Sequence, residues 1–146
     1  MSGKIPKRKG VCAIVFRKRK GRTEFLLLHR ILHWKGWEFP KGGIDGKETA
    51  LKALKRELKE ETGILEFKSV KSLNARLEFY DRFRRRIFSG KAFLVEFFPD
   101  SKISLAKNKV KEHSSFKWVS KSKVLKTLTH KTWGKVFRKA NKIMPT

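Results

Sequence analysis

The sequence contains few of the features that would tie a protein to a membrane, a secretory route or a disulfide framework. Cysteine occurs once in 146 residues, which excludes an intramolecular disulfide, and Cys12 lies in the apolar run VCAIVF, where a core residue is expected. No segment approaches the roughly 18 apolar residues of a membrane helix, and the first residues, MSGKIPKRKG, lack the apolar part of a secretory signal. We therefore expect a cytoplasmic protein folded as one domain over residues 1–146.

Acidic residues are also scarce. Asp and Glu total 13 against 38 Lys and Arg, which gives a formal net charge of +25. Such an excess indicates polyanionic partners or substrates, namely nucleotides, RNA or an anionic surface. The cations are spread along the chain, and the run RKRKGR (residues 17–22) lies between two apolar segments, so it is expected at a solvated hairpin tip. Composition alone therefore does not identify a dedicated nucleic-acid-binding face.

A cluster of acidic residues falls in one predicted helix, residues 49–62. At about 100° per residue, its side chains fall on three faces: an apolar stripe, a lysine face and a carboxylate face. These are, in order, Leu51, Leu54 and Leu58; Lys52, Lys55 and Lys59; and Glu57, Glu60 and Glu61. Three carboxylates at this spacing repel one another, while Ala50 and Ala53 leave space on the same side. A solvated helix face would explain a single pair of glutamates, but the cluster suits a hard divalent cation such as Mg²⁺.

The segment around this helix, GGIDGKETALKALKRELKEETGI (residues 42–64), fits the pattern G-x5-E-x7-R-E-U-x-E-E-x-G-U, where U is a bulky aliphatic residue. It resembles the signature of the Nudix hydrolases, and every fixed position matches. The resemblance implies a Mg²⁺ site, with Mn²⁺ as the alternative ion, in which Glu57 and Glu61 are the main ligands and Glu60 assists. It also implies that the backbone carbonyl of Lys41 completes the shell. Arg56, one turn before Glu60, is placed to orient that carboxylate.

The rest of the pattern predicts an α/β fold in which strands and helices alternate without repeats. Expected strands are 11–16, 24–29, 37–39, 67–73, 75–83, 87–98 and 116–119, and expected helices besides 49–62 are 121–128 and 132–143. Residues 40–48 are expected to form a glycine-rich loop and 99–111 a long polar loop. A mixed β-sheet sandwiched between α-helices fits this order, and it is the Nudix fold that the resemblance implies.

Nudix enzymes cleave a nucleoside diphosphate linked to another group, using a metal that withdraws charge and a water that attacks phosphorus in line. The attacking water needs a base. The expected catalytic residues are Glu60 and Arg56 on the helix and Glu112 in KEHSSFKWV, where related enzymes often carry a further carboxylate. Glu112 would act as base or extra metal ligand, and the alternative is a glutamate exposed on a loop. His113 is the weaker candidate base, and the other histidines show no ligand spacing.

The segment WEFPKG (residues 37–42) resembles the lead-in of the dinucleoside tetraphosphate hydrolases, which tend to place a lysine before the glycine. Lys41 would pair with a phosphate. Tyr80 lies close to where that subfamily carries a tyrosine, so it would stack on a purine or, alternatively, pack within the strands. The proline that ADP-ribose members tend to carry downstream is absent. The leading expectation is therefore Mg²⁺-dependent hydrolysis of diadenosine tetraphosphate to ATP and AMP.

Other functions remain open within the family. WEFPKGGID also resembles the pyrophosphohydrolases that act on the 5′ end of RNA, which usually carry glutamine in place of Lys41, and the high charge suits a long polyanion. Removal of oxidised nucleoside triphosphates is a third function. A non-enzymatic alternative is a Nudix scaffold that binds RNA without chemistry, but the intact carboxylates of RELKEET argue against it. The sequence leaves the oligomeric state open.

Overall fold

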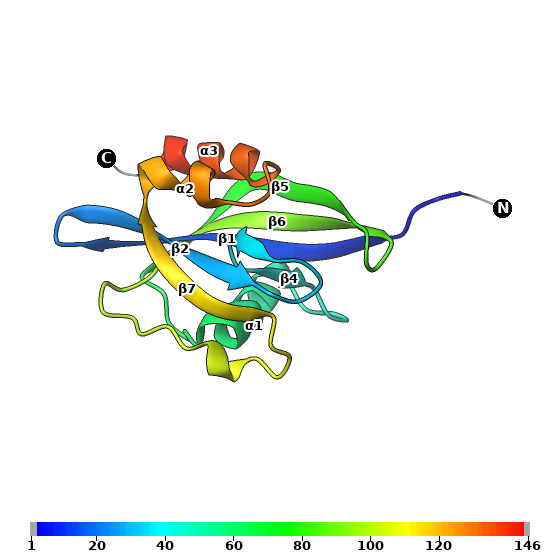
Figure 1. Cartoon of the computed structure of the whole chain (residues 1–146), viewed down its shortest axis with the longest axis horizontal. Coiled ribbons are helices and arrows are strands. Elements are labelled where there is room, and N and C mark those ends of the chain that lie inside the picture. The colour runs from blue at the N-terminus through cyan, green and yellow to red at the C-terminus, as the bar shows by residue number, and fades with distance from the viewer. Residues whose placement is uncertain (1–2, 145–146) are drawn as a thin grey trace.

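The computed structural model describes residues 3–144, and Figure 1 shows a sheet with helices on both of its faces. In this part of the chain the sheet has seven strands in the order β3-β2-β1-β6-β5, with β4 also paired to β1 and β7 to β2. β1 and β6 are parallel and the other pairs are antiparallel, so the sheet is mixed. The strands are β1 (Lys7–Arg19), β2 (Arg22–Arg30), β3 (Gly36–Glu38), β4 (Lys41–Gly43), β5 (Ser69–Asp81), β6 (Arg86–Glu96) and β7 (His113–Ser120).

The helices cover two separate hydrophobic cores, one on each face of the sheet. Successive residues of β1 alternate between the cores: Ile14 packs on the side of α3 (Trp133–Ile143), and Val15 packs on the side of α1 (Ala50–Thr62). The short helix α2 (Lys121–Thr127) lies with α3, above the sheet in the view of Figure 1. Burial on both faces is what a central strand between two helical layers requires. The predicted α/β sandwich is confirmed.

The helix α1 begins and ends where the sequence predicts. Thr49 caps its N-terminus by accepting a hydrogen bond from the amide of Lys52 at 3.2 Å. Gly63 ends it in the left-handed conformation, with φ of 75°, which glycine adopts without steric cost. These two ends fix how far the helix extends along the sheet, and therefore which of its side chains face the strands.

The apolar stripe predicted for α1 is only partly correct. Leu54 and Leu58 are buried, but Leu51 is 43% exposed. Ala53, which was expected to leave space beside the carboxylates, is fully buried in the core, and Glu61 is buried on the same side. The buried arc of α1 therefore runs from Ala53 to Thr62 and is centred near Leu54 and Glu61, while Leu51 in the first turn is exposed. Within the carboxylate face, Glu61 is buried and the Glu57 side chain is 13% exposed, whereas the Glu60 side chain is 39% exposed.

Three sheet elements differ from the prediction. The two strands expected over 67–73 and 75–83 form one strand, β5, whose pairing with β6 shifts register between Ser72 and Arg76. Asn74 within that shift has φ of 50°, which asparagine tolerates, so the polar interruption is a bulge and not a strand end. Part of the expected glycine loop forms β4 against β1. The strand expected from residue 116 begins at His113, which brings Glu112 to the start of β7.

The other predicted strands and helices are present, with β1 longer at both ends than expected. The expected polar loop 99–111 contains a single 3₁₀ turn, η1 (Leu105–Lys107). No helix within residues 3–144 is long and apolar enough to cross a membrane.

Candidate active site

A close approach between β4 and α1 forms the base of the site, and glycine makes it possible. A Cβ atom on Gly42 would collide with the carboxylate of Glu57, and one on Gly43 would collide with a neighbouring guanidinium. Gly46 alone among the three loop glycines has a positive φ, at 51°. A side chain at position 42 would therefore displace the Glu57 carboxylate, the expected metal ligand, from its place against the β4 backbone.

Arg56 ties this loop to the helix. Its guanidinium donates hydrogen bonds to Glu48 at 2.8 and 2.9 Å and to the carbonyl of Gly43 at 2.7 Å. It also donates to Glu57 Oε1 at 2.8 Å, whereas Glu60 lies 3.5 Å away. The contact with Glu60 that the spacing indicates is present, but the shorter contact is with Glu57. Arg56 thus orients two carboxylates while it fixes the loop on the helix.

The carboxylates of the site destabilise one another's charged forms. Burial raises the pKa of Glu57 to about 7, although its contacts with Arg56 lower it. The charges of Glu60 and Glu112 contribute to this rise. Burial also raises the pKa of Glu61 well above its usual range, and the neighbouring charges of Glu112 and Glu57 add to the effect. Glu61 is 2% exposed, and within residues 3–144 its Oε2 atom has no hydrogen-bond partner.

These residues fit a divalent cation. A cation between the carboxylates would favour their charged forms. It would also give the Oε2 atom of Glu61 the partner that this atom lacks within residues 3–144. Carboxylate oxygens are the donors that hard cations such as Mg²⁺ prefer. Ligand atoms of Glu61, Glu112 and His113 lie within 4.8 Å of one another, and the Oε1 of Glu61 accepts a hydrogen bond from the amide of Lys41 at 3.0 Å. The expected carbonyl ligand of Lys41 stays a prediction.

Sequence reasoning missed Glu38, which is 1% exposed and contacts Arg30, Lys41 and His113 beside the site. Its Oε2 accepts a hydrogen bond from Arg30 at 3.1 Å and lies 2.8 Å from His113 Nε2, and its Oε1 lies 3.3 Å from the ammonium of Lys41. Burial alone would raise the pKa of Glu38, but Lys41, His113 and Arg30 together lower it to about 2. The signal available in the sequence was a single glutamate between Trp37 and Phe39 in an otherwise apolar segment.

The start of β7 brings Glu112 and His113 to the carboxylates. Glu112 is the loop residue just before β7; it lines the same cavity as Glu57, and its side chain is about 26% exposed. Its expected role as base or metal ligand stays a prediction. His113 is buried against Glu38, and its Nδ1 lies 4.0 Å from Glu61. Its Nε2 thus contacts Glu38, and the expectation that His113 is the weaker candidate base stays a prediction.

The site opens into a cavity of about 590 Å³. The expected site residues that line it are Lys41, Glu57, Glu60, Tyr80 and Glu112. Glu61 and Arg56 lie behind the floor, where they contact the residues that line it. Tyr80 is 50% exposed on β5, so its ring is not part of the core. The structure therefore brings the expected metal, phosphate and base contacts to one cavity.

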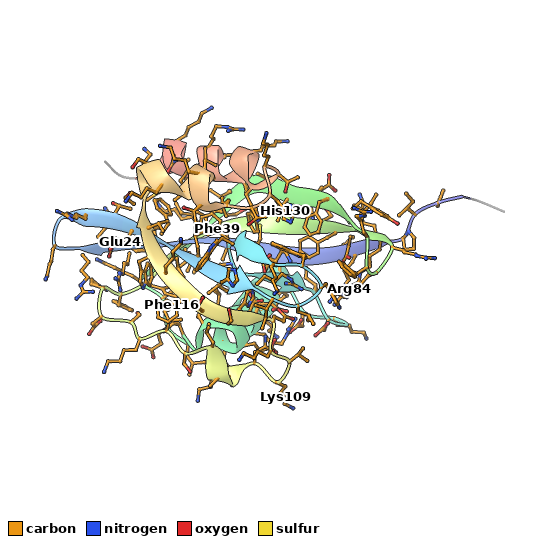
Figure 2. All side chains as sticks on the ribbon, viewed as in Figure 1. Glu24, Phe39, Arg84, Lys109, Phe116 and His130 are labelled. Carbon is orange, nitrogen blue, oxygen red and sulfur yellow. The ribbon has the colours of Figure 1, made fainter. Side chains whose placement is uncertain are left out.

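The mouth of the cavity carries cations and aromatic rings that the sequence analysis did not assign to the site. The ring of Phe83 stacks on His33 with centroids 4.8 Å apart, and Trp34 meets His130 edge-on at 4.4 Å. Arg84 and His130, labelled in Figure 2, both line the cavity. We call the exposed and half-exposed cations that line the cavity its rim: Arg8, Arg82, Arg84, Arg86 and Lys131. Arg8 pairs with Asp45 and Arg84 pairs with Asp81. The floor is thus rich in carboxylates, and the rim is cationic and aromatic.

Comparisons with known proteins agree with this geometry. A sequence model of the NUDIX domain matches residues 6–140. The chain is similar to the RNA pyrophosphohydrolase of a Nitratiruptor species, with 34% identity over 124 residues, 77% of this chain and 77% of that protein. It is also 42% identical over 64 residues to the RNA pyrophosphohydrolase of a Sulfurovum species, a match that spans 43% of this chain and 41% of that protein.

Solved structures show the same fold. A binary complex of a C. elegans Ap4A hydrolase superimposes with a TM-score of 0.79 at 25% identity, over 92% of this chain and 96% of that chain. The MutT protein of Methanosarcina mazei Go1 superimposes with a TM-score of 0.74 at 24% identity, over 97% of each chain. Because the family model matches residues 6–140, and the carboxylate helix and the glycine contact lie within that range, the chain belongs to the Nudix family of hydrolases.

Proposed function

We propose that this Nudix hydrolase removes phosphate groups from the 5′-polyphosphate end of RNA in a Mg²⁺-dependent reaction. The observation that carries the proposal is the rim of arginines and Lys131 around an acidic floor. A short polyphosphate chain is already met at the floor by Lys41 and the metal, whereas an RNA strand leaves the cavity and passes the rim. The similarity to RNA pyrophosphohydrolases supports the same substrate.

The chain's own residues supply most of the chemistry. Glu57, Glu60 and Glu61 would hold the cation, and a bound Mg²⁺ would withdraw charge from phosphate oxygens and acidify a coordinated water. Glu112, which faces the cavity, would accept the proton of the attacking water. The Lys41 ammonium would meet a phosphate as a point charge.

Buried Glu38 and partly buried Arg56 keep these groups in position. Glu38 lies 3.3 Å from the Lys41 ammonium and therefore restricts where that charge can point. Arg56 holds Glu57 at 2.8 Å, so one carboxylate of the metal set is oriented before a cation arrives. Such preorganisation lowers the cost of ordering the site when substrate binds.

Diadenosine tetraphosphate, the substrate favoured by the sequence, is the second candidate. Lys41 and Tyr80 line one cavity, as that interpretation requires, and the C. elegans Ap4A hydrolase has a similar structure. Hydrolysis of oxidised triphosphates has no separate support. A binding scaffold without chemistry does not account for the crowded carboxylates, whose mutual repulsion destabilises the folded protein unless they bind a cation.

A substrate panel tests the proposal. We expect Mg²⁺-dependent release of phosphate or pyrophosphate from 5′-triphosphorylated RNA with a higher kcat/KM than for diadenosine tetraphosphate, ADP-ribose or oxidised nucleotides. Changing Arg82, Arg84 and Arg86 to glutamine should reduce kcat/KM for RNA while leaving diadenosine tetraphosphate hydrolysis within a few-fold of normal. Efficient cleavage of diadenosine tetraphosphate together with negligible cleavage of RNA would favour the dinucleotide as substrate. If no substrate shows metal-dependent release of phosphate, only the non-enzymatic RNA-binding scaffold would remain.

A further inference from the structure

Acidic residues are absent from one of the two helical layers of the molecule. In the sequence no Asp or Glu follows Glu112, whereas lysines and one arginine continue as far as Lys142. That acid-free segment forms β7, α2 and α3, so the layer above the sheet in Figure 1 carries cations alone. Figure 2 shows nitrogen-tipped side chains extending outward from these two helices. The layer below contains α1 with its carboxylates.

Four of these cations form a line that we call the α3 track, defined as Lys131, Lys135, Arg138 and Lys142. They are spaced by three or four residues, so from the turn before α3 onward they lie on one side of the helix. All four are exposed, and the opposite side of α3 is buried in the core by Trp133, Val136, Phe137 and Ala140.

The track cations have no acidic partner within residues 3–144. None of the ion pairs formed in this part of the chain includes a residue of the track. Lys139, which lies between two of them, is different, because its ammonium donates a hydrogen bond to the carbonyl of Asn74 at 2.8 Å. Lys139 therefore anchors α3 to β5, and the track is left to meet an external anion.

The track begins at the cavity. Lys131, Thr132 and Trp133 all line its mouth, and α3 leads away from there toward the C-terminus. From Lys135 to Lys142 the helix rises about 10 Å at about 1.5 Å per residue. Phosphates in a stacked strand are about 3.4 Å apart along the axis, so the track is long enough for roughly three consecutive phosphates beyond the cavity.

We infer that the α3 track binds the backbone phosphates of single-stranded RNA downstream of the 5′ end held in the cavity. The inference rests on the proposed function for the direction of the strand, but binding at the track needs no hydrolysis. A mononucleotide or dinucleotide held at the metal does not extend along the helix. A lipid bilayer fits less well, because the apolar side of α3 is committed to the core and a surface-binding helix must insert that side.

The test compares two triple variants of equal charge change. One replaces Lys135, Arg138 and Lys142 by glutamine. The control replaces the exposed lysines of α1, which are Lys52, Lys55 and Lys59. The control residues are on a helix that packs on the other face of the sheet, away from the track. Binding of fluorescent single-stranded RNA, with and without a 5′-triphosphate, is measured by anisotropy in EDTA over a range of salt concentrations.

We expect the α3 variant to bind long RNA at least about tenfold more weakly at low salt, with a slope of log affinity against log salt reduced by roughly 2, or about 0.7 for each of three phosphates. The control should keep the wild-type slope. Both variants should hydrolyse a triphosphorylated dinucleotide like the wild-type protein, because its chain ends within the cavity.

Equal losses in both variants would show that net charge and not the track governs binding, and no loss in the α3 variant would also overturn the inference. Loss of sedimentation with phosphatidylserine vesicles while RNA binding stays normal would assign the track to a membrane instead. If wild-type protein binds RNA through the track but hydrolyses no triphosphorylated RNA, the proposed function fails and the inference stands.

Discussion

Replacing Glu61 by glutamine should raise the stability of the metal-free protein while removing its activity. The side chain keeps its shape, and its amide oxygen can still accept the hydrogen bond from the Lys41 amide that Glu61 Oε1 receives at 3.0 Å. The new NH₂ group replaces Oε2, which has no hydrogen-bond partner within residues 3–144 and faces other carboxylates. The NH₂ group is a hydrogen-bond donor, so it can bond to the neighbouring carboxylate oxygens that repel Oε2 of Glu61.

The size of the effect follows from that exchange. An unsatisfied buried polar group costs about 1–3 kcal/mol, and 1 kcal/mol shifts the unfolding midpoint of a chain of this size by about 2–4 °C. We expect the variant to unfold roughly 2–12 °C above the wild-type protein in EDTA. With Mg²⁺ at about a hundred times its Kd, the wild-type protein should gain about 2.7 kcal/mol, which the variant should largely lack. The difference between the unfolding midpoints of the variant and the wild-type protein should therefore become smaller or change sign when Mg²⁺ is added.

Turnover and unfolding are measured on the same preparations. Activity of Glu61→Gln at saturating Mg²⁺ should fall at least about a hundredfold, equivalent to about 2.7 kcal/mol of transition-state stabilisation. Glu66→Gln, which removes an exposed carboxylate just past α1, is the matched control and should change neither quantity. Near-normal turnover of Glu61→Gln would refute its role as a metal ligand. A lower midpoint in EDTA would refute the argument from repulsion, whatever the activity.

Two further outcomes test the cavity. Tyr80→Ala should weaken substrate binding by roughly 1–3 kcal/mol if the half-exposed ring stacks on a base, while Tyr80→Phe should be nearly silent in the same titration. Equal losses would indicate a hydroxyl contact, and no loss would exclude the ring from the site. The pKa of Glu57 in the folded protein is raised from the ordinary 4.5 to about 7. Without metal, its contribution to the free energy of unfolding is therefore greatest at low pH and decreases as the pH rises toward about 7. Because Mg²⁺ favours the charged form, the Mg²⁺-induced rise in unfolding midpoint should be larger at about pH 8 than at about pH 5, and an equal rise at both would contradict this assignment.

The parts of the fold that sequence could predict are those whose information is local. Thr49, Gly63 and the periodicity between them define α1 within one segment, so its bounds were predicted nearly to the residue. The position of Leu51 was not, because burial in the first turn depends on where the sheet edge lies. Asn74 shows the same limit, since a polar residue in a strand marks either an end or a bulge, and only pairing with β6 decides between them.

The site divides in the same way. The carboxylates of α1 follow from helical spacing, but Glu38 enters through the pairing of β2 with β3, and His113 enters through the pairing of β2 with β7. Neither pairing leaves a fixed spacing in the sequence. The contact between Phe83 and His33 joins two loops that are distant in sequence, so it was also invisible. Long-range pairing, and not residue type, limited the sequence analysis at each of these positions.

The net charge shows most clearly what the fold adds to the sequence. Along the chain the cations are dispersed, which argued against a dedicated binding face. In the structure, however, carboxylates gather at and just behind the floor of the cavity, namely Glu38, Glu57, Glu61 and Glu112. The segment after Glu112 forms a layer whose only charged side chains are cations. An approaching polyanion therefore meets attraction at the rim before it meets repulsion at the floor. The floor accepts phosphate only when a cation offsets its charge, so metal and substrate should bind cooperatively. A cationic exterior around an anionic floor thus attracts polyanions generally, and we expect their tight binding at the floor to require a bound cation.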